Sequence, residues 1–279
     1  MRAIGVNTWV WTSPLTDADL AVLAPRIAHW GFDVIELPVE QPGDWNPEAA
    51  AELVAGLGLA ASVVLVMPPG RELVAASSVA QTQDYLRHCV DVAVTVGAPA
   101  ISGPAYASVG RTWRMDAGER KNVYAELKEN LRPVVDYAGE RGVRIGVEPL
   151  NRYETSVINT VEQALDALPD GCGLALDTYH LNIEERRPND AIRLAGARIA
   201  HLQVCGTDRG APGPDHFDWT GFTSAVADSG YQGPLVIESF TAGNASIATA
   251  ASVWRPLATT QDDLATDGLA FLRKLTHIG

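Results

Sequence analysis

Four apolar segments in the second half of the chain each end in a side chain that offers oxygen to a cation. They end in three carboxylates, Glu148, Asp177 and Glu238, and one carboxamide, Gln203. Three carboxylates held close together would repel one another by several kcal/mol or would force one of them to stay protonated. A divalent cation removes this cost, and hard oxygen donors suit Mg2+ or Mn2+ better than zinc. The pattern therefore predicts a metal centre, with a purely structural polar cluster as the alternative.

Glu148 and Glu238 are also candidates for acid/base catalysis. If the four segments are consecutive strands of an eight-strand ring, these two side chains come from strands three positions apart and face each other across the cation. One carboxylate can then remove a proton beside a carbonyl group while the other delivers a proton to the opposite face, which yields an epimer. If the same base returned the proton to the neighbouring carbon, the reaction would be an aldose–ketose isomerisation.

The four segments belong to a longer alternation of short β-branched runs and stretches of helical periodicity. Strands are expected at Ile4–Val10, Val34–Pro38, Ala60–Val66, Ala100–Ser102, Arg144–Glu148, Leu174–Asp177, Ile199–Val204 and Leu235–Glu238. Helices are expected between and after them, at Thr16–Trp30, Pro47–Leu57, Gln81–Val96, Glu119–Arg141, Thr160–Leu168, Asn189–Ala195, Trp219–Ser229 and Gln261–Leu275.

Eight strands alternating with eight helices predict a single (β/α)8 TIM barrel over residues 1–279. The active site of such a barrel lies at the C-terminal ends of its strands, here strands five to eight. A doubly wound open sheet is the structural alternative. That fold usually carries a glycine-rich GxGxxG fingerprint after its first strand, and this chain has none there. The barrel is therefore favoured.

The composition narrows the classes of partner. Of the 279 residues 47% are apolar, and the formal net charge of -13 argues against binding to nucleic acid or to an acidic membrane surface. No apolar stretch of the sequence approaches the roughly 20 residues of a membrane span. The three cysteines lack CxxC spacing, which disfavours a disulfide framework or a zinc knuckle. We therefore expect a cytoplasmic protein with a small-molecule partner.

Three motifs in the second half of the chain are long enough to be specific. The first is Glu-Pro-Leu-Asn-Arg-Tyr-Glu-Thr at 148–155, and the second is Leu-Asp-Thr-Tyr-His-Leu-Asn-Ile-Glu-Glu at 176–185. The third is Glu-Ser-Phe at 238–240, followed later by Val-Trp-Arg at 253–255. Together they resemble the xylose isomerase-like superfamily of sugar phosphate isomerases and epimerases, in particular the D-tagatose, D-allulose and L-ribulose 3-epimerases. The resemblance extends over nearly the whole chain.

The resemblance implies metal ligation by Glu148, Asp177 and Glu238, with Glu148 and Glu238 also serving as the acid/base pair. Mn2+ is the expected cofactor, with Mg2+ or Co2+ as alternatives. Barrels of this kind often associate, so we expect a homo-oligomer, either a dimer or a tetramer, although nothing in the sequence decides between them.

The resemblance also implies that Glu154, His180 and Arg209 bind the hydroxyl groups and the carbonyl-side oxygens of a sugar. Taken singly, each has an ordinary structural interpretation: a solvated residue, a histidine satisfied at a helix start, and a surface cation. Trp113 is one of several aromatic residues expected near the mouth of the barrel, where its ring could stack on a sugar.

The chain departs from these epimerases in the seventh strand, where they usually place a ligand histidine and this chain has Gln203. His201 is two residues earlier, and the strand period of two directs it to the same face, one layer deeper in the barrel. A glutamine at this ligand position resembles the pattern of the hydroxypyruvate isomerases of the same superfamily. Gln203 is therefore still expected to bind the metal. The sequence leaves open whether His201 or His216 enters the site.

The first functional expectation is a ketose 3-epimerase that acts on a free sugar. One alternative, suggested by Gln203, is an aldose–ketose isomerase of the hydroxypyruvate type. Another is a lyase or dehydratase that acts on a keto-inositol or a keto-glycoside through the same enolate chemistry. A non-catalytic sugar-binding barrel belongs to a different class, and the presence of both Glu148 and Glu238 argues against it.

Overall fold

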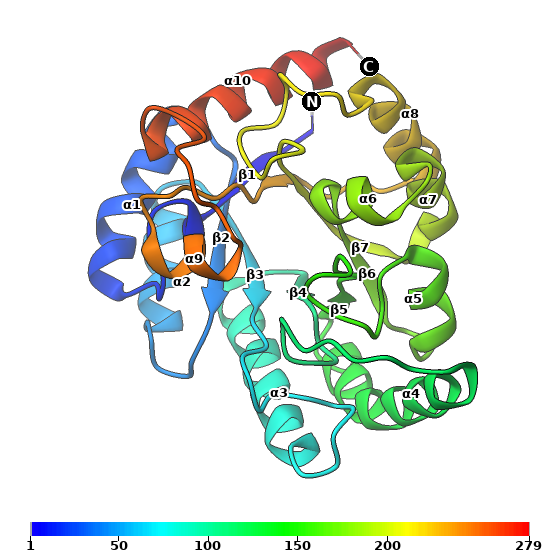
Figure 1. The fold of residues 1–279 in the computed structure, drawn as a ribbon. Coiled ribbons are helices and arrows are strands. Elements are labelled where there is room, and N and C mark those ends of the chain that lie inside the picture. Colours follow the sequence, from blue (N-terminus) through cyan, green and yellow to red (C-terminus); the bar gives the residue numbers. More distant parts are fainter. Residues whose placement is uncertain (1, 279) are drawn as a thin grey trace.

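A computed structural model describes residues 2–278, so Met1 and Gly279, which belong to the expected barrel, lie outside the described residues. Eight strands form a closed barrel in which neighbours in the chain pair in order, and β8 pairs with β1 in parallel. The strands are β1 (Ile4–Asn7), β2 (Val34–Val39), β3 (Ala60–Leu65), β4 (Ala100–Gly103), β5 (Arg144–Val147), β6 (Gly173–Asp177), β7 (Ile199–Val204) and β8 (Leu235–Ile237). The predicted (β/α)8 fold class is confirmed (Figure 1).

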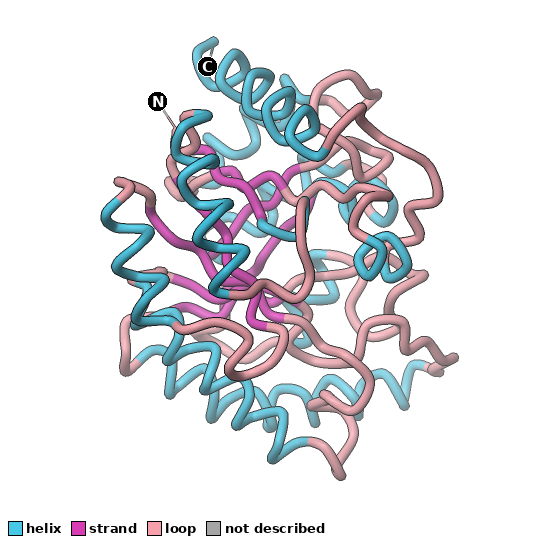
Figure 2. The backbone as a smooth tube through the Cα atoms, turned by 90° about the vertical axis from the view of Figure 1, so that its left-hand side faces the viewer, coloured by secondary structure: helices cyan, strands magenta, loops and turns pink. Residues whose placement is uncertain are grey.

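Helices surround the barrel, and the two ends of the described chain lie close together (Figures 1 and 2). The α-helices are α1 (Asp17–Trp30), α2 (Pro47–Gly56), α3 (Val79–Val96), α4 (Ala117–Gly139), α5 (Val161–Ala167), α6 (Thr178–Glu184), α7 (Pro188–Ala195), α8 (Trp219–Ser229), α9 (Ala245–Ala250) and α10 (Gln261–Ile278). Two 3-10 helices are η1 (Thr8–Val10) and η2 (Gly196–Arg198). None of the helices within residues 2–278 is long and apolar enough to cross a membrane.

The strands are buried along nearly their whole length because helices cover the outside of the barrel and side chains fill its inside. Every residue of β2 and of β6 is buried. The apolar side chains of the strands pack with those of the surrounding helices into one large core. Polar side chains in such a setting need partners, which makes each buried polar residue of the strands informative.

The first strand is shorter than predicted. It ends at Asn7, whose side chain accepts a hydrogen bond from the N–H of Trp9 at 2.8 Å. This contact caps η1, so the chain turns where the β-branched pattern predicted a strand to Val10. The turn leaves the Asn7 side chain buried at the end of β1.

Helix boundaries differ from the prediction where caps decide them. Helix α4 begins at Ala117, two residues before the predicted start, because Asp116 and Glu119 form a reciprocal capping box. The Asp116 side chain accepts from the N–H of Glu119 at 2.9 Å, and the Glu119 side chain accepts from the N–H of Asp116 at 2.8 Å. Helices α6 and α9, of seven and six residues, were not predicted from the sequence.

Candidate active site

Glu148 is the first residue after β5, and its main chain is held on both sides. Its N–H donates to the carbonyl of Gly103 at 2.9 Å, and its carbonyl accepts from the hydroxyl of Tyr106 at 3.0 Å. Gly103 has a φ of 139°, and a Cβ there would lie 2.7 Å from the carbonyl oxygen of Leu65, so a side chain would be strained at this position. These contacts fix where the Glu148 side chain leaves the backbone.

Asp177 and Glu238 reach the same end of the barrel from β6 and β8. Asp177 is the last residue of β6 and caps α6, where its side chain accepts from the N–H of Tyr179 at 2.9 Å. Glu238 directly follows β8, and its N–H donates to the carbonyl of Val204 at 3.1 Å. Both side chains are buried, as is that of Glu148. The structure therefore brings together the three carboxylates that were predicted as metal ligands.

Arg209 lies between two of these carboxylates. Its Nη1 donates to Oδ2 of Asp177, and its Nη2 donates to Oε2 of Glu238 at 2.8 Å. The guanidinium also lies over the ring of Phe240, 4.4 Å from the ring centre, and the residue is buried. We call Glu148, Asp177, Arg209 and Glu238 the mouth cluster. One positive charge and three carboxyl groups meet in it, so the cluster keeps an excess of negative charge when all are ionised.

His180 faces the mouth cluster from α6. Its Nε2 lies 3.5 Å from Oε1 of Glu148 and 3.8 Å from Oδ2 of Asp177. Its Nδ1 accepts a hydrogen bond from the backbone N–H of Asn151 at 3.0 Å. Because Nδ1 is an acceptor, the neutral ring carries its hydrogen on Nε2, toward the carboxylates. Burial lowers the pKa of His180 and so favours this neutral form.

Glu148, Asp177 and His180 offer three ligand atoms that all lie within 4.8 Å of one another. The three residues could hold a cation only if His180 lost its hydrogen from Nε2, because a protonated ring nitrogen cannot ligate. The backbone donor at Nδ1 opposes that tautomer. His180 is therefore better suited to donate a hydrogen bond to a substrate oxygen than to bind a metal.

The electrostatic environment shifts the pKa values of the three carboxyl groups of the mouth cluster in different directions. Burial raises the pKa of Glu148 well above its usual range, and the neighbouring carboxylates of Glu238 and Asp177 raise it further. Burial also raises the pKa of Glu238, although Arg209 opposes this effect. Against the effect of burial, Arg209 and His180 hold the pKa of Asp177 below its usual value. Asp177 is therefore the member that ionises most readily, and the two glutamates are the candidates for proton exchange.

A second group of polar side chains lies inside the barrel, in contact with the mouth cluster, and centres on Glu36 of β2. The Glu36 carboxylate accepts from Nδ2 of Asn7 at 2.9 Å, from Oγ of Ser62 at 3.1 Å and from Nε2 of Gln203 at 2.9 Å. Nε2 of His201 lies 2.7 Å from its Oε1. All five residues are buried. We call Asn7, Glu36, Ser62, His201 and Gln203 the floor cluster.

Gln203 joins the two clusters. Its Nε2 donates to Oε2 of Glu36 and also to Oε1 of Glu238, the latter at 2.8 Å. Both hydrogens of the amide are thereby used, and its Oε1 is buried without a hydrogen-bond partner among the described residues. Oε1 of Glu148 is also buried without a hydrogen-bond partner among the described residues. Two buried acceptors without donors are costly unless a cation or another ligand contacts them.

Asn7 and Glu36 were not predicted as site residues from the sequence. A signal was available for Glu36, because a glutamate stands inside the apolar run of β2, where an unpaired charge would be prohibitive. His201 was predicted to lie one layer deeper in the barrel than Gln203, and in the structure its ring lies against Glu36.

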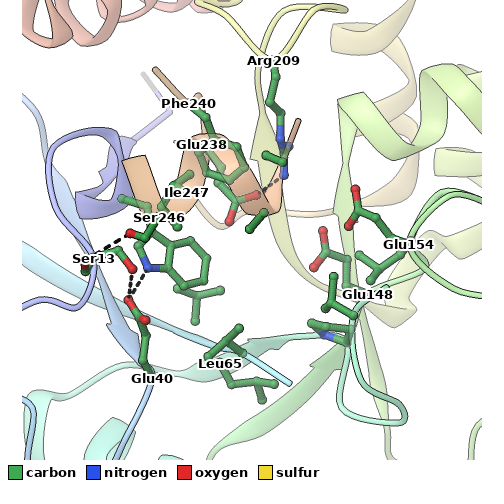
Figure 3. Close-up of a pocket in the computed structure, with 18 of the residues that line it drawn as sticks. Ser13, Glu40, Leu65, Glu148, Glu154, Arg209, Glu238, Phe240, Ser246 and Ile247 are labelled. Atoms are coloured by element: carbon green, nitrogen blue, oxygen red, sulfur yellow. Dashed lines mark hydrogen bonds and ion pairs between the residues drawn. The ribbon is translucent and has the colours of Figure 1, made fainter. Parts of the chain in front are cut away.

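A cavity of about 260 Å3 opens over the mouth cluster. Glu148, His180, Arg209 and Glu238 line it, and so does Glu154, whose Oε1 accepts from Nδ2 of Asn151 at 2.7 Å. Figure 3 shows Glu148 and Glu154 at the right of the cavity, with Glu238 and Arg209 above and to the left of them. The structure thus brings three of the predicted substrate-binding residues, Glu154, His180 and Arg209, to one space from three different segments of the chain.

Trp113 is not among the described residues that line this cavity. Its ring lies instead under the guanidinium of Arg111, 4.2 Å from the ring centre. His216 is exposed and contacts the hydroxyl of Thr207 at 3.5 Å, and it does not line the cavity either. Trp9 is the aromatic residue of η1 that lines it.

Comparison with known proteins places the chain in a family. The family model of the xylose isomerase-like TIM barrel matches residues 25–275. A protein of Synechocystis named as a probable ketose 3-epimerase is 30% identical over 97% of this chain and 95% of its own length. A solved structure of an L-ribulose 3-epimerase superposes with a TM-score of 0.89 at 26% identity, covering 100% of this chain and 95% of the other. A D-allulose 3-epimerase of Methylomonas in complex with D-allulose has a TM-score of 0.87 at 27% identity, covering 98% and 96%.

Proposed function

The chain belongs to the xylose isomerase-like TIM barrel family, and from that premise we propose that it is a divalent-metal-dependent ketose 3-epimerase acting on a free sugar. The observation that carries the proposal is the pair Glu148 and Glu238, which enter one cavity from β5 and β8 and are both buried with raised pKa values. The names of the relatives that match nearly the whole chain support the reaction class.

The two glutamates divide one proton exchange between the two faces of a substrate carbon. One carboxylate removes the proton from C3, and the electrons of the broken C–H bond move toward the C2 carbonyl oxygen to give an enediolate. The other glutamate, in its acid form, delivers a proton to the opposite face of C3. Because burial raises the pKa of Glu148 and of Glu238, each carboxylate is a stronger base than that of a solvated glutamate.

The residues present fit a divalent cation. We propose that Glu148, Asp177, Glu238 and Oε1 of Gln203 hold it, which would give partners to the two buried acceptors that lack them. The donor set consists of hard oxygen atoms, which favours Mn2+, with Mg2+ or Co2+ as alternatives. When bound, such a cation polarises a carbonyl group and stabilises the charge of an enediolate.

Three further residues are proposed to bind the substrate. Nε2–H of His180 and the guanidinium of Arg209 are donors suited to carbonyl-side oxygens, whereas the Glu154 carboxylate is an acceptor suited to a hydroxyl group. All three line the cavity that contains Glu148 and Glu238. Trp113 is left out of the proposal because its ring is engaged with Arg111 away from the cavity.

We further propose that the protein acts in the cytoplasm as a homodimer or homotetramer. All three cysteines are buried and free, which suits a reducing compartment. Size-exclusion chromatography with light scattering would measure the assembly, and a monomer at micromolar concentration would contradict that part of the proposal.

The second candidate function is aldose–ketose isomerisation of the hydroxypyruvate type, which Gln203 at the third ligand position favours. The same enolate chemistry would also serve a lyase or dehydratase acting on a keto-inositol or a keto-glycoside. One experiment separates these reactions: the Mn2+-loaded protein is incubated with a panel of ketoses in D2O and followed by NMR.

Deuterium at C3 together with the inverted product is the result expected for the epimerase. Deuterium at C1 or C2 together with an aldose would instead establish the isomerase, and loss of water would establish a dehydratase. Absence of exchange with every substrate, while Mn2+ still binds, would exclude all three.

A further inference from the structure

The cavity has a second polar end that the proposed chemistry does not use. Glu40 is the first residue after β2, and its side chain lines the cavity on the side opposite Glu148 and Glu154, as Figure 3 shows. The lining between and around these ends is largely apolar and includes Val64, Val66, Ile247, Ala250 and Ala251. A carboxylate in an apolar wall needs a reason, because it gives up part of its hydration there.

The Glu40 carboxylate is held through one of its two oxygens. Oε1 accepts from Nε1 of Trp9 at 2.9 Å and from Oγ of Ser13 at 2.7 Å. The Glu40 carbonyl accepts from Nη1 of Arg71 at 2.6 Å, which fixes the main chain as well. Within residues 2–278, no protein donor contacts Oε2. One oxygen is therefore fixed and the other is free to accept from hydroxyl groups, so the acceptor is already oriented before a ligand binds.

The charges that line the cavity favour an uncharged ligand. Four of the described lining residues are carboxylates: Glu40, Glu148, Glu154 and Glu238. Arg209 is the only arginine or lysine among the described lining residues, and its guanidinium is already paired with Asp177 and Glu238. A phosphate group near Glu40 would meet a carboxylate. The guanidinium of Arg71 beside the Glu40 main chain does not line the cavity, and it donates to the carbonyls of Glu40 and Val66 and to Oε1 of Gln41. Like-charge contacts of this kind disfavour binding.

We infer that Glu40 is a specificity-determining residue: it binds hydroxyl groups at the end of a ketose remote from the carbonyl, and it excludes sugars phosphorylated at that end. The inference rests on the proposed function, because that function places C2 and C3 beside Glu148 and Glu238. The rest of the sugar must then extend across the cavity, toward Glu40. A ketose too short to reach Glu40 should be insensitive to it.

The test uses two variants and two ketoses that differ in length. Glu40→Leu removes the carboxylate at similar size, and Glu40→Gln removes only its charge. D-fructose has hydroxyl groups beyond C4, whereas L-erythrulose carries the same C3 centre and ends at C4. We expect Glu40→Leu to lower kcat/KM for D-fructose by about 10- to 100-fold, mainly through KM, and to change that for L-erythrulose by less than about twofold.

The second part of the test compares D-fructose with its 6-phosphate. In Glu40→Gln, the preference for D-fructose over D-fructose 6-phosphate, as a ratio of kcat/KM values, should fall by about tenfold or more. Asp44→Asn is the matched control, because Asp44 lies in the same loop between β2 and α2 and does not line the cavity. This control should leave every ratio unchanged.

Equal losses on D-fructose and L-erythrulose in Glu40→Leu would overturn the inference, since Glu40 would then act on the whole site. So would an unchanged kcat/KM for D-fructose. If the wild-type protein turns over no ketose, the proposed function fails. The inference can still be decided by NMR measurement of glucitol and erythritol binding, in which Glu40→Leu should weaken only the six-carbon polyol.

Discussion

The floor cluster and the mouth cluster are both groups of buried carboxyl and polar side chains, yet they balance their charge in opposite ways. Glu36 in the floor cluster has a fixed partner at each oxygen. Burial acts to raise the pKa of Glu36, but His201, Gln203 and Asn7 outweigh it and leave the pKa below its usual value. In the mouth cluster, burial and neighbouring carboxylates raise the pKa of Glu148 far above it.

The opposite pKa shifts of Glu36 and Glu148 distinguish a carboxylate that stabilises the fold from one that is available to a ligand. A carboxylate surrounded by fixed donors stabilises the fold and has no capacity left for a ligand. A carboxylate that faces other carboxylates, with one buried oxygen lacking a partner, costs stability unless something binds to it. Gln203 contacts both clusters. Its NH2 group donates to Glu36 of the floor cluster and to Glu238 of the mouth cluster, whereas its Oε1 has no hydrogen-bond partner among the described residues.

The largest expected effect concerns turnover. Glu148→Gln and Glu238→Gln should each lower kcat for ketose epimerisation by about 100- to 10,000-fold, because each removes the proton-exchanging group of one face. Initial rates with Mn2+ at saturation measure this effect. Ser62→Ala serves as a floor-cluster control that should retain kcat within a few-fold, and full activity in either glutamine variant would remove that residue from the mechanism.

The next effect concerns stability and has opposite signs in the two clusters. Glu36→Gln should destabilise the protein by about 3–5 kcal/mol, since it breaks a buried charge network and leaves donors unpaired. Glu148→Gln should leave the metal-free protein as stable as the wild type or make it more stable, because it relieves repulsion with Glu238 and Asp177. Urea unfolding in EDTA measures both, and a loss in Glu148→Gln as large as that in Glu36→Gln would erase the distinction.

A smaller effect is expected for one donor of the floor cluster. Ser62→Ala removes the hydrogen bond from Oγ to the Glu36 carboxylate and should cost about 1.5–3 kcal/mol of unfolding free energy. The same urea titration applies. A change below about 0.5 kcal/mol would show that Asn7, Gln203 and His201 suffice to hold the charge of Glu36.

The smallest effect is a dependence of metal-free stability on pH. Because the pKa values of Glu148 and Glu238 are raised in the folded state, the folded protein binds more protons than the unfolded chain above about pH 4.5. Their contribution therefore lowers stability as pH rises from 4.5 through the folded pKa values. The pKa of Glu36 is lowered, so its stabilisation is complete above about pH 4.5 and is lost as pH falls below that value.

Melting temperatures of the EDTA-treated protein between pH 3 and 9 measure both contributions. Glu148→Gln should flatten the decline above pH 4.5, and Glu36→Gln should flatten the loss below it. Saturating Mn2+ should also remove the decline at higher pH, because the cation favours the ionised carboxylates. A decline that persists in Glu148→Gln would assign the pH dependence to other groups.

The sequence was sufficient to predict the barrel and the placement of the three carboxylates. Both depend on local signals: β-branched runs alternate with helical periods, and Glu148, Asp177 and Glu238 each end such a run. Since all parallel strands of a barrel end on the same side, the end of a run already places its last side chain at the mouth.

The contacts between those side chains could not be predicted in the same way. That Arg209 pairs with Asp177 and Glu238 depends on the conformation of the loop after β7, where Arg209 itself has a φ of 72°. Glu40 follows β2 just as Glu148 follows β5, yet its environment is set by Trp9 and Ser13, which come from another part of the chain. Such partners are fixed by tertiary packing rather than by spacing.

The central claim is that Glu148 and Glu238 act on opposite faces of one carbon. The most direct test follows the loss of deuterium from C3 of two separately labelled epimers, D-fructose and D-psicose, in Mn2+-loaded Glu148→Gln and Glu238→Gln in ordinary water. Each variant should release label from only one epimer, the two variants should differ in which one, and neither should interconvert the sugars. A variant that releases label from both epimers, or that still epimerises, would contradict the claim.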